Sequence, residues 1–406
     1  MKSVVIVYVL DVLAKSLLVV TGFFLVRLLS PDEYARYTFA MSIIAVATQA
    51  VSGSLNRIYI AGHREFVADQ TPGLFLGLQV WTVLVPATVV WAIVGRDDSV
   101  HGWMLLSIVA TCCLDFARTC FQQRLSFGRF SAVELARAAL LVGLLAYLRF
   151  RGDVLQAQHA LAAQATTMFA VFLVAFGREI DWRDVLRVVP ALRLASRIVR
   201  GDFVFLFGYF FLMAFLLQVE VFVLKTLGKS IDVATFGAAT RYALVLSLAL
   251  NAVNTVLFPL LQQVRTAEEI RGVYRRHTQM LLAFVPIVGL AAMAAPWVLP
   301  WIDQGKYPIA VPTFQILCVA NVALFAFSPY VNLLLRFNDF RFLLGLIVAA
   351  VLLDTGLNAA LVPSLGAIGA AVALTVGNGA FTGAIFVRAR RKLPVWLADT
   401  TSGTAT

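Results

Sequence analysis

The sequence predicts an all-α integral membrane protein of about 12 transmembrane helices, in two six-helix lobes related by a parallel pseudo-twofold axis. Three observations predict this fold class: the composition, the recurrence of long apolar segments, and a similarity between the two halves. Of the 406 residues, 61% are hydrophobic and 14% are charged, against roughly 25% charged in a soluble domain. A soluble protein of this length could not bury so much apolar surface, whereas lipid can cover it.

Apolar segments recur along the whole chain, and each is long enough to cross the hydrocarbon core, which takes about 20 helical residues. Short breaks rich in Gly, Pro, Asp and Arg separate them. The predicted spans are residues 3–26, 37–60, 73–95, 100–121, 131–150, 154–176, 203–224, 235–261, 279–301, 309–335, 341–363 and 365–387.

The basic residues orient the chain, because short cytoplasmic loops collect Lys and Arg. With the N-terminus inside, more than twice as many of the 33 Lys and Arg residues fall in inside loops as in outside loops. We therefore expect both termini to be cytoplasmic. The net charge of +11 then reflects basic residues in the cytoplasmic loops, which set the topology and attract anionic lipid headgroups. It does not indicate nucleic-acid binding.

The longest polar break lies near the middle of the chain and suggests a division into domains. We expect an N-terminal six-helix lobe over 1–177, a cytoplasmic interfacial linker over 178–202, a C-terminal lobe over 203–388 and a basic cytoplasmic tail over 389–406. A basic face and an apolar stripe favour a linker helix that lies in the membrane interface; a solvated basic loop is the alternative. The residues concerned are Arg193, Arg197 and Arg200, and Trp182, Val185, Leu186 and Val189.

The two halves share a short segment, residues 25–40 and 223–239, when one gap is allowed. The paired residues are Arg27 and Lys225, Glu33 and Asp232, Ala35 and Ala234, Tyr37 and Phe236, and Ala40 and Ala239. Both copies follow an odd-numbered span on the same side of the membrane, which predicts a parallel repeat. Transporters built from such repeats bind substrate between the halves and alternate access by rocking one half against the other.

Three turns carry residue patterns typical of one transporter family. Residues 25–37 resemble its first external turn, although Ala35 replaces the usual Gly, and residues 305–317 resemble the turn before its tenth helix. Residues 354–375 resemble its penultimate turn, with Asp354 where a neutral polar residue is more usual. The matching positions there are Asn358, Pro363, Gly366, Gly369 and Ala370. The chain thus resembles bacterial polysaccharide flippases, the O-antigen and exopolysaccharide branch of the multidrug/oligosaccharidyl-lipid/polysaccharide exporter superfamily.

This resemblance implies a V-shaped pair of lobes around a central cationic cavity, in a bacterial inner (plasma) membrane. It implies that undecaprenyl-diphosphate-linked oligosaccharide repeat units are flipped from the cytoplasmic to the periplasmic leaflet by alternating access, for cell-surface polysaccharide biosynthesis. The expected partners are the lipid-linked oligosaccharide and membrane lipids, and no nucleic acid. A polysaccharide polymerase and chain-length machinery are further candidate partners.

Several cations lie within predicted spans, where an ionisable side chain costs about 2.5–3.5 kcal/mol on insertion scales. Arg57 and Arg241 have no acidic residue at helical spacing, while Lys15 follows Asp11 by four residues. We expect Lys15, Arg57 and Arg241 to line the cavity and bind a diphosphate or an acidic sugar. As alternatives, Arg57 and Arg241 reach a membrane surface, or Asp11 and Lys15 only neutralise each other.

The predicted spans also hold acidic and amide side chains that could serve transport. Asp11, Glu220 and Asp354 are candidate cavity or coupling acids, for H⁺ or Na⁺, and Glu220 and Asp354 have no basic residue nearby in the sequence. Either of those two could instead pair with a cation on another helix. Gln218, Asn251 and Asn254 could line a sugar path or form hydrogen bonds between helices.

Two further acid–base pairs, Asp115 with Arg118 and Glu134 with Arg137, lie near the cytoplasmic ends of their spans. Residues three apart meet on one face of a helix. We expect these pairs to neutralise themselves and to help assemble the helix bundle.

The sequence offers no sign of an enzyme, a cofactor or a metal site. It contains no nucleotide-binding loop, no Ser/His/Asp grouping and no His/Cys metal spacing, and its four cysteines form no disulfide framework. Two alternatives to the flippase stay open. A multidrug/cation antiporter of the same superfamily would favour an anionic cavity, and a membrane-embedded polysaccharide polymerase or ligase would need a larger external loop than any predicted here.

Overall fold

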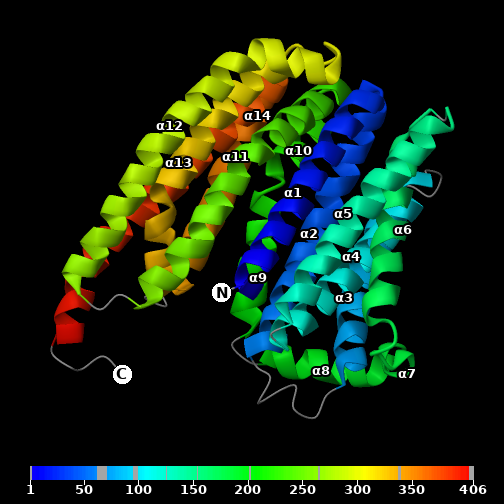
Figure 1. The fold of residues 1–406 in the computed structure, drawn as a ribbon, viewed down its shortest axis with the longest axis horizontal. Coiled ribbons are helices and arrows are strands. Elements are labelled where there is room, and N and C mark those ends of the chain that lie inside the picture. The colour runs from blue at the N-terminus through cyan, green and yellow to red at the C-terminus, as the bar shows by residue number, and fades with distance from the viewer. Residues whose placement is uncertain are drawn as a thin grey trace. The chain divides into compact units, whose positions relative to one another are not determined.

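The computed structural model describes residues 2–61, 71–94, 99–124, 126–152, 154–200, 203–263, 266–336 and 340–401 (Figure 1). Within these ranges all regular elements are α-helices. The chain forms two compact units, Met1–Gln218 and Val219–Thr406. The fold-class prediction, an all-α membrane protein, is confirmed.

The helices of the N-terminal unit are α1 (Lys2–Leu28), α2 (Pro31–Ala61), α3 (Pro72–Val94), α4 (Ser99–Gln123), α5 (Phe127–Phe150), α6 (Ala157–Phe176), α7 (Trp182–Val185), α8 (Val188–Arg200) and α9 (Phe203–Leu216). The helices of the C-terminal unit are α10 (Val219–Leu227), α11 (Ser230–Gln263), α12 (Ala267–Asp303), α13 (Ala310–Arg336) and α14 (Phe340–Thr401).

Each predicted span coincides with one of these helices or with part of one, apart from span 203–224, which is broken. That span becomes the pair α9 and α10, separated at Leu217 and Gln218. Predicted spans 341–363 and 365–387 both lie in α14, on either side of Gly366, whose backbone is non-helical (φ 54°, ψ −129°). Gly366 therefore divides the single long helix α14 into two helical segments.

Among the described residues, 8 helices are long and apolar enough to cross a membrane, or 9 if α9 and α10 form one span. Two facts about the described residues account for the difference from the predicted number. Helix α14 counts once despite its break, and many side chains of α1 and α3 lie outside the described residues. The count of about 12 stays a prediction.

In the N-terminal unit, α4 packs against α6 and α1 packs against α5. Aromatic side chains fill the core beside α4. The Phe116 ring is stacked on Phe75 with ring centroids 6.1 Å apart, and it meets Tyr59 at 5.2 Å and Phe176 at 6.4 Å. These rings are almost fully buried and fix the relative positions of α2, α3, α4 and α6.

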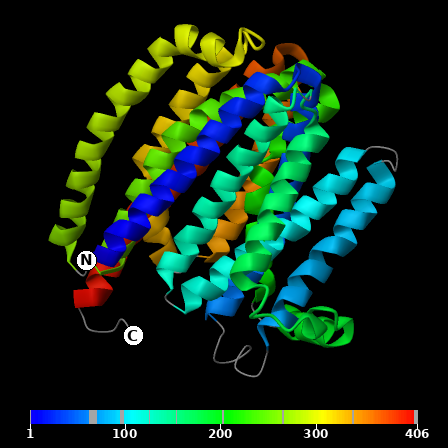
Figure 2. The same ribbon diagram turned by 45° about the vertical axis from the view of Figure 1, so that its right-hand side comes forward.

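The linker forms two short helices, α7 and α8, that lie across the end of the N-terminal unit near α3 (Figures 1 and 2). Two glycines of α3 allow this close approach, since a Cβ at Gly73 or Gly77 would lie 2.6 Å from a linker carbonyl oxygen. The Trp81 indole donates a hydrogen bond to the Val185 carbonyl at 3.1 Å. Small residues and indole together dock the linker on α3.

Replacing Gly77 with Ala should loosen this contact and lower the Tm of the protein in detergent. The new methyl group would lie 2.6 Å from the Val185 carbonyl oxygen, and overpacking of this kind costs about 1–3 kcal/mol. Gly102→Ala in α4 is the matched control, since nothing lies within 4 Å of its Cβ position. An equal change in Tm for both variants would contradict the docking role of Gly77.

Helix α8 has one face against the protein and one face turned outward. Ala191 and Leu194 are buried, whereas Val189 and Leu192 are 59% and 60% exposed. Leu186, just before the helix, is 70% exposed. An outward apolar face on a basic helix is typical of a helix in the membrane interface, and this placement of the linker stays a prediction.

In the C-terminal unit, α13 lies between α11, α12 and α14, and α10 packs against α14. The capping box of Thr266 and Glu269 starts α12. The helix ends where Gln304 and Gly305 take left-handed backbone conformations, with φ of 59° and 72°. This common helix stop satisfies the last carbonyl groups and turns the chain toward α13.

The two acids paired in the internal repeat occupy comparable places in their own units. Glu33 accepts a hydrogen bond of 2.7 Å from the backbone nitrogen of Ala157, at the start of α6. The Asp232 carboxyl lies against Gly366, where the second segment of α14 begins, so closely that no Cβ would fit on that glycine. In each half, an acid that follows the first span contacts the start of the last span.

Candidate functional site: a buried carboxyl pair in the C-terminal unit

Two acids meet in the interior of the C-terminal unit. Glu220 lies in the first turn of α10, and Asp354 lies in the first segment of α14. Their side chains are within hydrogen-bonding distance of each other, and they are only 1% and 2% exposed. Two carboxyl groups this close share a proton, or both are ionised with a cation bound between them.

Most oxygen atoms of the pair have no hydrogen-bond donor from the residues that the structure describes. Within the described part of the chain, both carboxyl oxygens of Asp354 and Oε1 of Glu220 have no hydrogen-bond donor apart from a proton on the pair itself. Asn358 lies one turn beyond Asp354, and its amide nitrogen donates to the Asp354 carbonyl at 2.9 Å. The buried Oδ1 of Asn358 has no donor among the described residues.

Gly377, in the second segment of α14, covers the other side of Asp354. A Cβ at this position would lie 3.1 Å from Oδ1 of Asp354, so glycine lets the backbone approach the carboxyl closely. The site thus combines α10 with both segments of α14. Buried carboxyl oxygens without donors can hold a proton or a hard cation.

The sequence predicts the two acids of this site and not its other residues. Glu220 and Asp354 are both predicted as coupling or cavity acids, but nothing in the sequence predicts that they meet each other. Asn358 and Gly377 are not predicted as site residues. The spacing of Asp354 and Asn358, four residues apart on one helix face, is the signal that could have identified Asn358.

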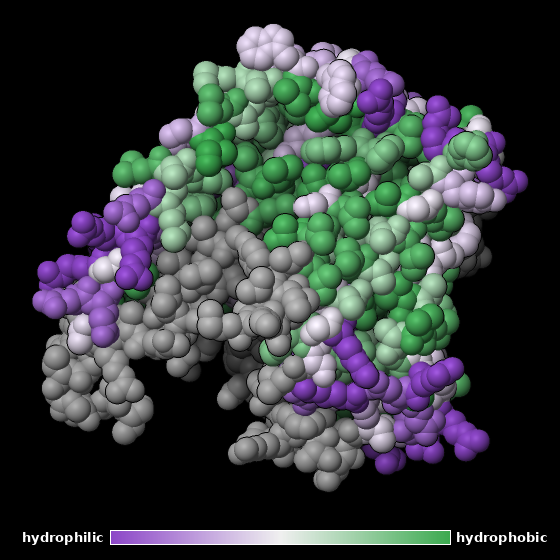
Figure 3. Space-filling view, in the orientation of Figure 1, coloured by the Kyte–Doolittle hydropathy of each residue, from purple (hydrophilic) through white to green (hydrophobic). Residues whose placement is uncertain are grey.

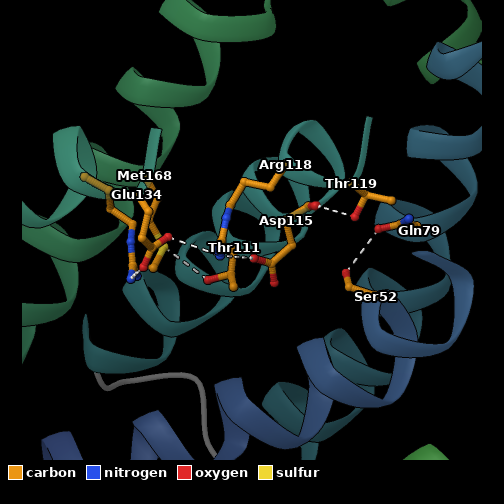
Figure 4. A network of polar contacts seen from close by, with 9 residues as sticks. Ser52, Gln79, Thr111, Asp115, Arg118, Thr119, Glu134 and Met168 are labelled. Atoms are coloured by element: carbon orange, nitrogen blue, oxygen red, sulfur yellow. Dashed lines mark hydrogen bonds and ion pairs between the residues drawn. The ribbon is translucent and has the colours of Figure 1, made fainter. Parts of the chain in front are cut away.

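A second polar network lies in the N-terminal unit, where Glu134 of α5 joins two arginines (Figure 4). Arg118 of α4 lies 3.1 Å from Glu134 and 3.8 Å from Asp115. Arg137 forms a second ion pair with Glu134. The two predicted pairs are therefore one network between two helices, with Glu134, 7% exposed, at its centre.

Near this network, a chain of neutral hydrogen bonds connects α2 and α3. Ser52 donates to Oε1 of Gln79 at 3.1 Å, and the Gln79 amide donates to Oδ1 of Asn56 at 2.6 Å. Ser52 and Gln79 are almost fully buried. These bonds satisfy polar groups between spans, which is their expected role inside a membrane.

The predicted cavity cations lie on three helices. Lys15 is on α1 and is partly exposed, Arg57 is on α2 with a side chain outside the described residues, and Arg241 is on α11 and is partly exposed. Lys15 and Arg57 belong to the N-terminal unit and Arg241 to the C-terminal unit. Their meeting in one cavity stays a prediction.

The remaining predicted site residues are not part of the carboxyl pair or of the polar network around Glu134. Gln218 is partly exposed in the break between α9 and α10, and its backbone nitrogen donates to the Phe215 carbonyl at 2.9 Å. The side chains of Asp11, Asn251 and Asn254 lie outside the described residues. Among the described residues, no group of three or more His, Cys, Asp or Glu residues could hold a metal ion.

Comparison with known proteins gives a clear result for the fold. No family model matches the chain, and no curated protein matches it. A multidrug resistance MATE family transporter of the MOP superfamily, in an inward-facing conformation, aligns over 98% of this chain and 96% of its own, with 14% identity and a TM-score of 0.68. The lipid II flippase MurJ aligns over 98% and 91%, with 10% identity and a TM-score of 0.73.

The chain has the fold of MOP superfamily transporters. A third example, a MOP superfamily transporter from Pyrococcus furiosus with a binding pocket of reverse polarity, aligns over 98% of this chain and 96% of its own, with 15% identity and a TM-score of 0.64. The three structures each align over 98% of this chain, and one of them has a binding pocket of reverse polarity. The fold alone therefore does not identify a substrate.

Proposed function

We propose that the protein is a MOP-type transporter that flips undecaprenyl-diphosphate-linked oligosaccharide repeat units to the outer leaflet for surface polysaccharide synthesis. The observation that carries this proposal is the fold shared with a lipid II flippase over 98% of the chain at a TM-score of 0.73. The three turns that resemble polysaccharide flippases support the same substrate class. A transporter of this kind resides in the bacterial inner membrane with both termini cytoplasmic.

Lys15, Arg57 and Arg241 are the proposed contacts of the substrate's diphosphate. They lie on α1, α2 and α11, and α11 follows α10 as α2 follows α1 in the internal repeat. Guanidinium and ammonium groups form charge-assisted hydrogen bonds with phosphate oxygens.

Glu220 and Asp354 are the proposed coupling site. Three buried carboxyl oxygens of Glu220 and Asp354 lack a donor among the described residues, and they favour Na⁺ over H⁺ as the coupling ion, because a proton bridges only two oxygens. Binding of the ion removes the repulsion between the carboxylates and stabilises the packing of α10 on α14. A rocking transporter can use such a change to favour one of its conformations.

Drug/cation antiport is the second candidate function. The fold shared with a multidrug resistance MATE transporter and the buried carboxyl pair would both suit it. The positively charged candidate cavity residues favour an anionic substrate, and for this reason the flippase is preferred.

Deletion of the gene in its bacterial host tests the proposal. We expect lipid-linked oligosaccharide to accumulate on the cytoplasmic face and finished surface polysaccharide to be lost. A plasmid copy should restore both, and a copy with Lys15, Arg57 and Arg241 replaced by Ala should not, although it reaches the membrane at the normal level. Normal polysaccharide together with new drug sensitivity would establish the antiporter instead.

A further inference from the structure

A cavity of about 400 Å³ opens between α5 and α6 in the N-terminal unit. Small and apolar side chains line it: Ala132, Ala136 and Leu140 on α5, and Ala170, Val174 and Ala175 on α6. Leu140 is 50% and Val174 is 89% exposed, so the cavity is an open groove on the outside of the unit. Neither the carboxyl pair nor Lys15 or Arg241 is among the residues that line this groove.

One end of the groove is positively charged. Arg129, at the start of α5, lines the groove with a side chain that is 69% exposed, and its guanidinium carbon lies 5.9 Å from the centre of the Phe121 ring. Glu179 pairs with Arg129 at 3.5 Å and also with Arg124. Two guanidinium groups against one carboxylate leave an excess of positive charge there.

The length of the groove matches one leaflet of a bilayer. From Arg129 to Leu140 the helix rises about 16 Å at 1.5 Å per residue, and half of a hydrocarbon core is about 15 Å. Arg129 lies at the end of the unit where Glu179 leads into α7. Figure 3 shows hydrophilic side chains gathered at that end, with an apolar surface over the middle of the neighbouring helices.

We propose that this groove binds one anionic phospholipid, with an acyl chain between α5 and α6 and the headgroup phosphate on Arg129 and Arg124. Basic pockets between transmembrane helices bind acidic headgroups, and the small side chains leave room for a chain. Small residues also let a second helix approach. The excess positive charge at one end favours a lipid with an acidic headgroup over an apolar helix from a second copy.

Native mass spectrometry of the full-length protein tests this proposal. The protein is extracted from vesicles of equal parts dioleoylphosphatidylglycerol and dioleoylphosphatidylcholine, and retained lipids are counted. Wild-type protein should retain one phosphatidylglycerol. Ala136→Phe, which fills the groove, should lower this retention at least about tenfold, and Arg129→Ala should abolish the preference for phosphatidylglycerol over phosphatidylcholine.

Two matched variants are the controls. Ala139→Phe adds the same side chain at an exposed position of α5 that does not line the groove, and Arg149→Ala removes an arginine from the other end of α5. Both should retain lipid as the wild type does. Unchanged retention in Ala136→Phe would overturn the proposal. So would a wild-type dimer that Ala136→Phe dissociates, since the groove would then be an interface between copies.

Discussion

Wild-type protein should be stabilised by Na⁺, and Glu220→Gln or Asp354→Asn should abolish this stabilisation. A ligand that binds only the folded state adds about 2.7 kcal/mol at a concentration one hundred times its Kd. Each substitution removes a negative charge from the buried site, and the affinity for the ion should fall at least about tenfold, as it does when metal sites lose even an outer partner. The measurement is the Tm in detergent with sodium, potassium or choline chloride.

Asp303 provides the control for this experiment. It is as buried as Asp354, but it accepts hydrogen bonds from the Tyr242 hydroxyl at 3.1 Å and from the Gly305 nitrogen at 2.9 Å. Asp303→Asn should lower the Tm and leave its dependence on sodium unchanged. A wild-type Tm that responds to pH and not to sodium would assign the pair to H⁺. A Tm that responds to neither would remove the coupling role and leave the transport proposal standing.

Glu134→Ala should destabilise the N-terminal unit by about 3–5 kcal/mol, the cost of breaking a buried ion pair by removing one partner. The substitution leaves Arg137 without its ion pair and leaves Arg118 with only the 3.8 Å contact to Asp115. We expect a large loss of folded protein in the membrane and a lower Tm for the remainder. Fluorescence-detected size-exclusion chromatography after heating measures both.

Arg36→Ala is the comparison for Glu134→Ala, because Arg36 is 57% exposed and its pair with Glu33 spans 3.4 Å. An exposed pair of this kind contributes about 0–1 kcal/mol. The double variant Glu134→Ala with Arg137→Met should recover part of the stability, since it removes the charge that was left alone. If the double variant is no more stable than Glu134→Ala, neutralising Arg137 is not the role of Glu134.

The sequence predicts the helices of this protein well and their mutual contacts poorly. Long apolar segments and polar breaks locate α1 to α6 and α11 to α13, because each span needs about 20 apolar residues. The ends are less accurate where a helix continues beyond its apolar segment, as α12 does, which begins at Ala267 against the predicted start at residue 279. The break of α14 at Gly366 is visible as a turn in the sequence. The break between α9 and α10 is not, because Leu217 and Gln218 carry no helix-breaking signal.

The candidate site illustrates the limit of the sequence. Glu220 and Asp354 are visible as acids in apolar surroundings, since such residues are costly in lipid. That they face each other depends on the rotation of α10 and of α14 about their axes, which packing of the whole unit determines. The contact of Arg118 with Glu134 was missed for the same reason, whereas Glu134 with Arg137 follows from helical spacing alone.

The contact of Glu33 with Ala157 has a consequence for how the protein is made. It joins residues 124 positions apart, and ribosomes add about 5–20 residues per second, so the amide of Ala157 is synthesised roughly 6–25 s after the carboxylate that it meets. Until then α1 and α2 lie in the bilayer without the hydrogen bond that joins Glu33 to the start of α6. Membrane insertion of α6 is therefore the step that brings α2 and α6 into this contact, and a nascent chain stopped before it lacks the bond between them.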